Sequence, residues 1–225
     1  PVVKGLMPFF KRRTITFGTT EEADFRAKNI VSSGLHSNFS VERRFVGPDL
    51  EVELSMPGKH NILNALAAIA VASEENIADE QIISALKSFS GVGRRFQVTP
   101  NCLVAGKRLT LIDDYGHHPT EVMAVINTVR DVWPESKLIM VYQPHRYTRT
   151  ADLFSEFVSV LSLVDELIIL DVYSAGEKKI TGATSFDLIE AIEMKKDLKV
   201  KHARDIKDSI DILESVCRAD DIVLI

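Results

Sequence analysis

The sequence predicts an α/β protein built in two parts. In the C-terminal part, short apolar runs recur roughly every 30 residues with helical patterns between them, which is the length of a strand plus its crossover helix. In the N-terminal part, apolar and polar residues alternate in short stretches and lead into an alanine-rich helix. With 225 residues, 45% of them hydrophobic and 26% charged, the chain can bury a core without disulfides or a structural metal.

The C-terminal part is expected to form a mostly parallel sheet. Its expected strands are the apolar runs 109–112, 138–142, 167–170, 198–200 and 222–225. The spacing of apolar residues predicts helices over 122–133, 153–164 and 206–217. Strands that alternate with helices are joined by crossovers, and crossovers connect parallel strands. Lysines flank the weakest run, 198–200, so we expect it at an edge of the sheet.

The N-terminal part is expected to carry a β-hairpin region and two helices. A strand is expected over 14–18. Residues 30–54 alternate between apolar and polar, and Gly47-Pro48-Asp49 supplies a turn within them, which indicates an antiparallel hairpin. The expected helices are 62–73 and 79–89. Turn residues follow the second helix, and we assign 1–95 and 96–225 to separate domains.

Charge and hydropathy exclude several classes of protein. A net charge of −5 argues against a nucleic-acid partner, since a broad nucleic-acid surface needs a basic excess. No run of 18 apolar residues exists, so we expect no membrane partner, and the start lacks a signal-peptide pattern. Cys102 and Cys217 fit reduced thiols in the cytoplasm. The missing initiator Met and the apolar last residues indicate a piece of a longer protein.

Polar residues gather in the loops that follow three of the expected strands. Loops 113–119, 143–149 and 171–177 should open on one edge of the sheet, because ligands bind outside the carboxyl ends of parallel strands. Arg146 and Arg149 lie three residues apart, so their guanidinium groups would share a face and clamp a phosphate or carboxylate. The alternative is a solvated pair in surface salt bridges, worth roughly 0–1 kcal/mol.

Two other groups of polar residues each allow more than one interpretation. Asn61 and Asn64 share a face at a helix start and could read a base edge, although Asn61 could instead cap the helix. Asp113 and Asp114 could bind a metal, but successive strand residues point to opposite faces, and either could cap the helix that starts near Thr120. The sequence contains no G-x-x-x-x-G-K-[ST], G-x-S-x-G, CxxC or HExxH motif.

Four segments, taken in this order, resemble the Mur ligase family. They are PGKHNILNA at 57–65, GVGRRF at 91–96, DDYGHHPTE at 113–121 and HRYTRT at 145–150. The resemblance spans essentially the whole chain. Within the family, the third and fourth segments favour the members that join L-alanine to UDP-N-acetylmuramate over relatives such as the murein-peptide-recycling ligase.

The resemblance implies a place for this chain within a three-domain enzyme. Residues 1–95 match the last part of the central α/β ATPase domain, and 96–225 match the Rossmann-like C-terminal ligase domain. The P-loop, the Mg²⁺ ligands and the UDP-binding domain would lie upstream, so the N-terminal portion of the same chain would be a partner and the fragment alone inactive. The implied reaction uses ATP and Mg²⁺ to join L-alanine to UDP-N-acetylmuramate through an acyl phosphate, in peptidoglycan precursor synthesis.

The family's functional residues carry over onto matching positions of this sequence. Contacts to the nucleotide would come from His60, Asn61, Asn64, Arg95, Asp114, Tyr115 and His118. Binding of the incoming carboxylate and of the transferred phosphate would come from His145, Arg146 and Arg149. The role of His117 is open, and no metal ligand is assigned. We expect the two groups to converge on a cleft between the domains.

Two other functions stay open. A metal-dependent hydrolase could use the loop that contains Asp113, Asp114, His117 and His118. A non-catalytic nucleotide-binding module would use the same strand-end loops without turnover.

Overall fold

The computed structural model describes residues 5–225 of the chain. They form two compact units, with residues up to Ser90 in unit 1 and Gly91–Ile225 in unit 2, and each unit is described by itself. Both units combine helices with sheet, which confirms the predicted α/β class. No helix within residues 5–225 is long and apolar enough to cross a membrane.

Unit 1 contains a four-stranded sheet in the order β1-β2-β3-β4. Its elements are η1 (Met7–Phe9), β1 (Phe17–Gly18), β2 (Phe25–Ser33), β3 (His36–Arg43), β4 (Leu50–Leu54), α2 (Lys59–Glu74) and α3 (Asp79–Ser88). The predicted hairpin is present, because β3 and β4 pair antiparallel on either side of the 47–49 turn. The strand predicted over 14–18 is limited to β1, and the long strand β2, which pairs with β3, was not predicted.

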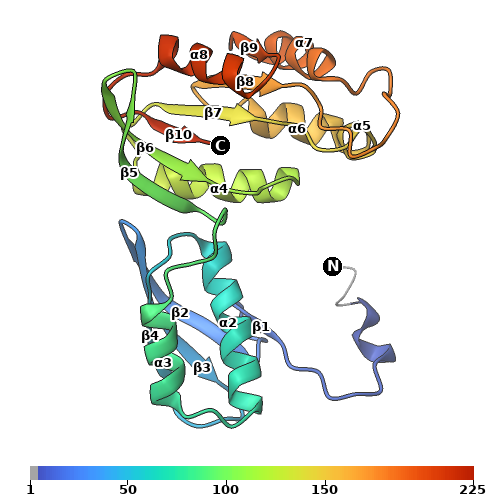
Figure 1. The fold of residues 1–225 in the computed structure, drawn as a ribbon. Helices are drawn as coiled ribbons and strands as arrows, with labels where there is room; N and C mark the ends of the chain where they lie inside the picture. The colour runs from blue at the N-terminus through green and yellow to red at the C-terminus, as the bar shows by residue number, and fades with distance from the viewer. Residues whose placement is uncertain (1–4) are drawn as a thin grey trace. The chain divides into compact units, whose positions relative to one another are not determined.

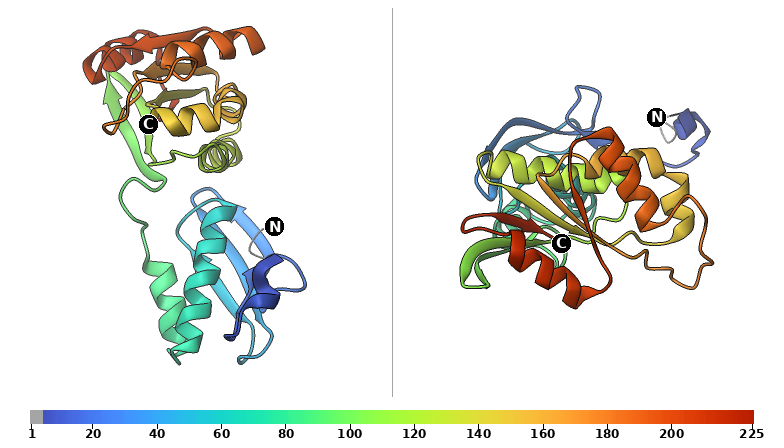
Figure 2. Two further views of the ribbon diagram at one scale, coloured as in Figure 1. Left: turned by 90° about the vertical axis from the view of Figure 1, so that its right-hand side faces the viewer. Right: turned by 90° about the horizontal axis from the view of Figure 1, so that it is seen from above.

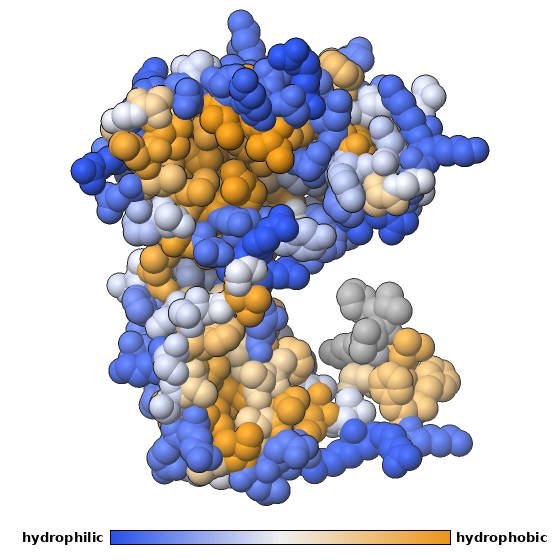
Figure 3. All heavy atoms as spheres, in the orientation of Figure 1, coloured by the Kyte–Doolittle hydropathy of each residue, from blue (hydrophilic) through white to orange (hydrophobic). Residues whose placement is uncertain are grey.

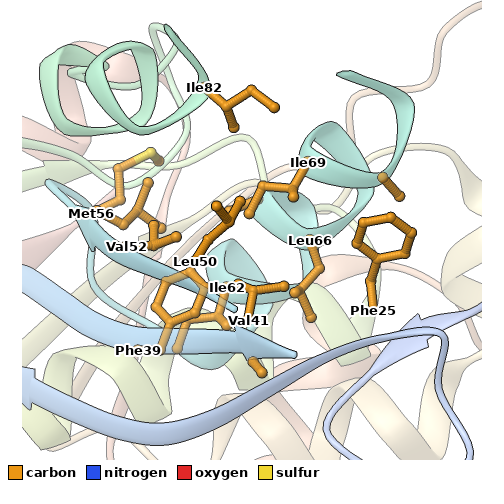
Figure 4. Close-up of a cluster of buried hydrophobic side chains, with 14 residues drawn as sticks. Phe25, Phe39, Val41, Leu50, Val52, Met56, Ile62, Leu66, Ile69 and Ile82 are labelled. Carbon is orange, nitrogen blue, oxygen red and sulfur yellow. The ribbon is translucent and has the colours of Figure 1, made fainter. Parts of the chain in front are cut away.

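One apolar cluster joins the helices of unit 1 to its sheet (Figure 4). Ile62, Leu66 and Ile69 recur at helical spacing along α2 and are almost completely buried in this cluster, so their burial stabilises the helix against the sheet. Arg43 at the end of β3 is also buried, with 2% of its side chain exposed. Its charge is compensated by Asp79 at the start of α3, with Nη2 and Oδ2 2.7 Å apart.

The first described residues add little to this core. Leu6, Phe9 and Phe10 are exposed, and the apolar spheres beside the grey ones in Figure 3 mark this segment. Ile15 is partly buried and packs against the cluster. The core of unit 1 therefore starts near Ile15.

Unit 2 is built on a six-stranded sheet in the order β5-β6-β10-β7-β8-β9. The strands are β5 (Gln97–Val104), β6 (Lys107–Asp113), β7 (Leu138–Tyr142), β8 (Glu166–Leu170), β9 (Val200–Ala203) and β10 (Ile222–Leu224). All neighbours pair in parallel except β5, which adds an antiparallel edge, so the mostly parallel sheet is confirmed. The strand predicted over 198–200 is shifted, because β9 begins at Val200, but it lies at the other edge of the sheet as expected. β10 lies between β6 and β7 (Figure 1).

The helices of unit 2 cover this sheet (Figures 1 and 2). They are α4 (Pro119–Val132), α5 (Tyr147–Asp152), α6 (Phe154–Leu161), α7 (Ser185–Lys195) and α8 (Ile206–Val216). Contacts run from α4 to α6 and from α6 to α7, so these three follow one another along the sheet. The crossover through α8 returns in the opposite direction, and right-handed connections therefore place α8 on the other face.

Three parts of unit 2 differ from the prediction. The helix expected over 153–164 begins earlier and is split into α5 and α6, with Leu153 at φ −118° between them. Strand β5 occupies a stretch expected to be a turn-rich boundary, and α7 was not predicted.

Candidate functional site

The carboxyl ends of the parallel strands bring the three predicted loops to one edge of unit 2. β6, β10, β7 and β8 are successive parallel neighbours, so the segments that follow β6, β7 and β8 open on the same side. The end of β10 ties the first loop down: the Asp114 amide donates to the Ile225 carbonyl at 2.9 Å, and the Ile225 amide donates to the Ile112 carbonyl at 2.9 Å.

Asp114 holds the first loop in shape. Its Oδ2 accepts the Phe96 amide at 2.8 Å, and its Oδ1 accepts the Gly116 amide at 2.7 Å. A Cβ added at Gly116 would lie 3.0 Å from that Oδ1, so the tight turn leaves little room for another residue there. Asp114, which the resemblance assigns to the nucleotide, therefore also joins this loop to the segment before β5.

The two neighbouring arginines before β5 differ in their surroundings. Arg94 lies over the Tyr115 ring, with its guanidinium carbon 4.8 Å from the ring centroid, and its Nε is 3.6 Å from an Asp113 oxygen. Its carbonyl accepts the Tyr115 amide at 2.9 Å. Arg95, the one expected to contact a nucleotide, is exposed, and its charge helps to lower the pKa of Glu121.

Helix α4 is capped by His118 rather than by an aspartate. The His118 Nδ1 accepts the Thr120 amide at 3.2 Å, while Glu121 Oε2 accepts the amides of His117 at 3.1 Å and His118 at 3.2 Å. The alternative in which Asp113 or Asp114 caps this helix is therefore wrong. Since Nδ1 accepts, the proton of a neutral His118 ring lies on Nε2, which leaves that nitrogen as a donor.

The pKa of Glu121 shows that it stays ionised in this cap. Burial acts to raise it, but the amide of His117, the His117 ring and the amide of His118 outweigh that effect, and the pKa is lowered. The His117 ring lies beside this carboxylate, with Nδ1 3.5 Å from Oε2, and also contacts the Tyr115 carbonyl at 3.0 Å.

Arg146 is paired with an acid from the third loop. Its Nε and Nη2 lie 2.7 and 2.6 Å from Glu177 Oε1, and Thr148 donates to the same carboxylate. The bond from the Thr148 amide is the main cause that lowers the pKa of Glu177 to about 2. Glu177 was not among the predicted functional residues.

Arg149 has no such partner. Within residues 5–225 no carboxylate forms an ion pair with it, and its Nη1 lies 3.4 Å from the His145 carbonyl. The predicted pair of arginines is therefore unequal, with Arg146 neutralised and Arg149 carrying an uncompensated charge. Burial lowers the pKa of His145, and the charge of Arg149 lowers it further, so this imidazole is neutral at pH 7.

Tyr142 is a residue of this edge that the sequence did not single out. It ends β7, is 5% exposed, and its hydroxyl has no hydrogen-bond partner among residues 5–225. Burial is the main cause that raises its pKa. An unsatisfied buried hydroxyl costs about 1–3 kcal/mol.

The candidates in unit 1 lie at the start of α2. Asn61 is buried, and its Nδ2 donates to the Pro57 carbonyl at 2.8 Å, so its amide already supports the turn before the helix. It does not cap α2, because Gly58 holds that position at φ +94°. Asn64 is exposed and His60 is half-buried. Their convergence with the strand-end edge of unit 2 stays a prediction.

Residues 5–225 contain no group of three or more His, Cys, Asp or Glu side chains that could hold a metal ion. The donors that the hydrolase alternative needs are therefore not assembled in the first loop.

Family comparison identifies the class of protein. The family model for the Mur ligase glutamate ligase domain matches residues 94–225, which is more than half of the chain, and the model for the Mur ligase middle domain matches residues 3–72. The chain belongs to the Mur ligase family. The assignment of 1–95 and 96–225 to separate domains stays a prediction.

Solved structures of related enzymes show the same fold. UDP-N-acetylmuramate-alanine ligase from Thermotoga maritima is 24% identical with a TM-score of 0.72, over 93% of this chain and 43% of that one. MurF ligase from the same organism, in complex with ADP, is 18% identical with a TM-score of 0.68, over 100% and 47%. Murein peptide ligase from Psychrobacter arcticus is 21% identical with a TM-score of 0.62, over 93% and 42%. The chain thus spans less than half the length of each.

Proposed function

We propose that this chain is part of an ATP-dependent ligase that joins L-alanine to UDP-N-acetylmuramate through an acyl phosphate, in peptidoglycan precursor synthesis. Family membership supports the reaction class. The choice of L-alanine is supported by the segments at 113–121 and 145–150, which resemble the members with that specificity.

One observation carries the proposal: Arg149 presents an uncompensated charge at the carboxyl edge of the sheet. Its Nη1 lies 3.4 Å from the carbonyl of His145, whose imidazole is neutral at pH 7. A cation with neutral hydrogen-bonding neighbours suits the carboxylate of an amino acid or a transferred phosphate. Catalysis of amide formation from an acyl phosphate then rests on positioning and on stabilisation of negative charge.

The nucleotide-side roles are part of the same proposal. Arg95 and Tyr115 are exposed on unit 2, and His118 keeps its Nε2 as a donor, so these groups can reach a bound nucleotide. Asp114 would contact it while holding the first loop. On unit 1, the adenine-side contacts would come from His60, Asn61 and Asn64.

ATP binding needs more than this chain. No P-loop motif occurs in the sequence, and residues 5–225 assemble no metal site, so the triphosphate and Mg²⁺ would be held by upstream residues. A cytoplasmic location belongs to the proposal, since the two free cysteines fit a reducing compartment.

The test measures phosphate release by the full-length protein with ATP and UDP-N-acetylmuramate, with and without L-alanine. We expect release to depend on L-alanine, and Arg149→Ala to lower kcat/KM for L-alanine at least tenfold, which is about 1.4 kcal/mol. Arg108→Ala is the matched control, because Arg108 is exposed near the amino end of β6, and it should stay within twofold of wild type.

Other outcomes select the alternatives. Phosphate release at the same rate with and without L-alanine would contradict the proposed ligase function. Nucleotide binding without turnover would favour the non-catalytic module, and stoichiometric metal in the purified protein would favour the hydrolase. An effect of Arg149→Ala below twofold would leave Arg149 as a solvated surface residue.

A further inference from the structure

We propose that Glu177 is a positioning residue of the strand-end site: it fixes Arg146 and neutralises it, so that Arg149 alone supplies the positive charge that binds the acceptor carboxylate. The inference rests on the proposed function for the identity of that carboxylate. The pairing itself is a property of unit 2.

Both oxygens of the Glu177 carboxylate accept hydrogen bonds from residues of the second loop. Oε1 accepts from Arg146 Nε at 2.7 Å and from Thr148 Oγ1 at 2.8 Å, and Oε2 accepts the Thr148 amide at 3.0 Å. Only 17% of the side chain is exposed. Because the pKa of Glu177 is lowered to about 2, the carboxylate stays ionised through the physiological range.

The backbone of the third loop is joined to the second loop at the same place. The Arg146 amide donates to the Tyr173 carbonyl at 2.8 Å, and the Tyr173 amide donates to the Pro144 carbonyl at 2.8 Å. The rings of His145 and Tyr173 also pack with centroids 4.9 Å apart. The third loop is therefore a brace for the turn that carries the site residues.

This brace holds a backbone conformation that is unfavourable by itself. Arg146 has φ +76°, in the left-handed region that residues other than glycine rarely adopt. Such a conformation persists when surrounding contacts determine it. The bonds to Glu177 and Tyr173 are contacts of that kind, and they act on the residue directly before the first turn of α5.

The brace also sets the charge of the site. Arg146 turns its Nε and Nη2 toward Glu177, so the pair contributes no net charge. His145 is neutral at pH 7, because its pKa is lowered by burial and by Arg149. Among residues 143–149, Arg149 is then the cation without a carboxylate partner. A single positive charge matches an amino-acid carboxylate better than a dianionic phosphate.

The experiment uses the full-length protein and compares Glu177→Gln and Glu177→Ala with wild type. We expect both variants to raise KM for the acceptor amino acid at least fivefold. The inhibition constant of inorganic phosphate should fall at least threefold, because Arg146 is no longer neutralised. A purely structural role would not tighten phosphate binding. Glu190→Gln is the matched control, since Glu190 is exposed on α7, and neither constant should change.

A second measurement does not depend on turnover. Amide hydrogen exchange at Thr148 should speed up at least tenfold in Glu177→Ala, while the Val122 amide, which bonds to His118 at the start of α4, keeps its protection. Unchanged exchange at Thr148 overturns the brace. Faster exchange with unchanged KM and unchanged phosphate inhibition overturns the positioning role. A wild-type protein without alanine-dependent release overturns the proposed function instead. Amide exchange at Thr148, which needs no turnover, then still decides whether Glu177 braces the turn.

Discussion

Arg146 and Arg149 show that two identical side chains, three residues apart, can be placed in different electrostatic surroundings. The first gives its Nε and Nη2 to Glu177, and the second has no carboxylate partner among residues 5–225. An ion pair such as Arg146–Glu177 contributes little to stability at a surface. Its effect is on binding, because the pairing neutralises Arg146 and leaves Arg149 as the cation that a ligand meets. The charge pattern of the turn therefore comes from its partner loop.

We predict that the imidazole of His145 titrates below its ordinary pKa of 6.5. Burial is the main cause, and the charge of Arg149 adds to it. The unfolded chain binds this proton more readily, so the contribution of His145 to stability is present above pH 6.5 and is lost as the pH falls toward the lowered pKa. An NMR titration of the ring protons checks this.

Arg149→Ala is the companion variant for that titration. Removal of this charge should raise the pKa of His145 toward 6.5 without reaching it, because burial still lowers the pKa. A wild-type titration at or above 6.5 would contradict a neutral imidazole in the site.

At the residue scale, the sequence indicated which side chains stand in the strand-end loops, but not which residues they bond to. The turn with His145 and both arginines could be singled out because chemistry-bearing side chains follow a strand. The role of Glu177 could not, since it lies 31 positions from Arg146 in a loop without periodicity. Likewise, the pattern at the start of α2 could not show that Asn61 is buried against Pro57.

Among the secondary-structure elements of unit 2, β10 joins the two halves of the sheet. It pairs with both β6 and β7, and all three of its residues are buried. Without it the sheet would be two separate pieces, β5-β6 and β7-β8-β9. Its side chains therefore lie in the core of the sheet.

We expect Leu224→Ala in β10 to lower the free energy of unfolding of unit 2 by about 2–5 kcal/mol, because it leaves a cavity in the core. Leu103→Ala is the matched control on the edge strand β5, where the side chain is 68% exposed, and it should cost less than about 0.5 kcal/mol. Urea unfolding followed by the fluorescence of Trp133, the single tryptophan, reports on unit 2. Equal losses for the two leucines would contradict the central position of β10.

Periodicity predicted the buried elements and failed at irregular ones. The apolar runs of β7 and β8 and the helical spacing of α4 match the structure closely. β5 was missed because Pro100 and Asn101 interrupt it with a bulge, where Asn101 has φ +56°. α7 could have been found from Thr184, which forms a capping box with Asp187.

At the scale of the whole molecule, the chain consists of two units with separate cores. One cluster lies between α2, α3 and the first sheet, and another lies between α8 and the second sheet. The change in sequence pattern suggests a boundary in this part of the chain, and the assignment of 1–95 and 96–225 to separate domains stays a prediction. The predicted site draws residues from both units, and their convergence stays a prediction.

We predict that the 225-residue chain by itself does not hydrolyse ATP, because it contains no P-loop motif. A phosphate-release assay with the purified chain checks this, and the full-length protein is the positive control. ATP hydrolysis that is seen with the chain and is lost in its Arg95→Ala variant would contradict the prediction. A contaminating enzyme would not respond to that substitution.

The place of β10 has a consequence for biosynthesis. Residues 222–224 are made after every other strand of their sheet, yet they belong at its centre. While the ribosome translates unit 2, the apolar edges of β6 and β7 have to wait unpaired, and unpaired edges are prone to aggregate. The sheet of unit 1 does not depend on this strand, whereas β6 and β7 of unit 2 are joined only once β10 is available.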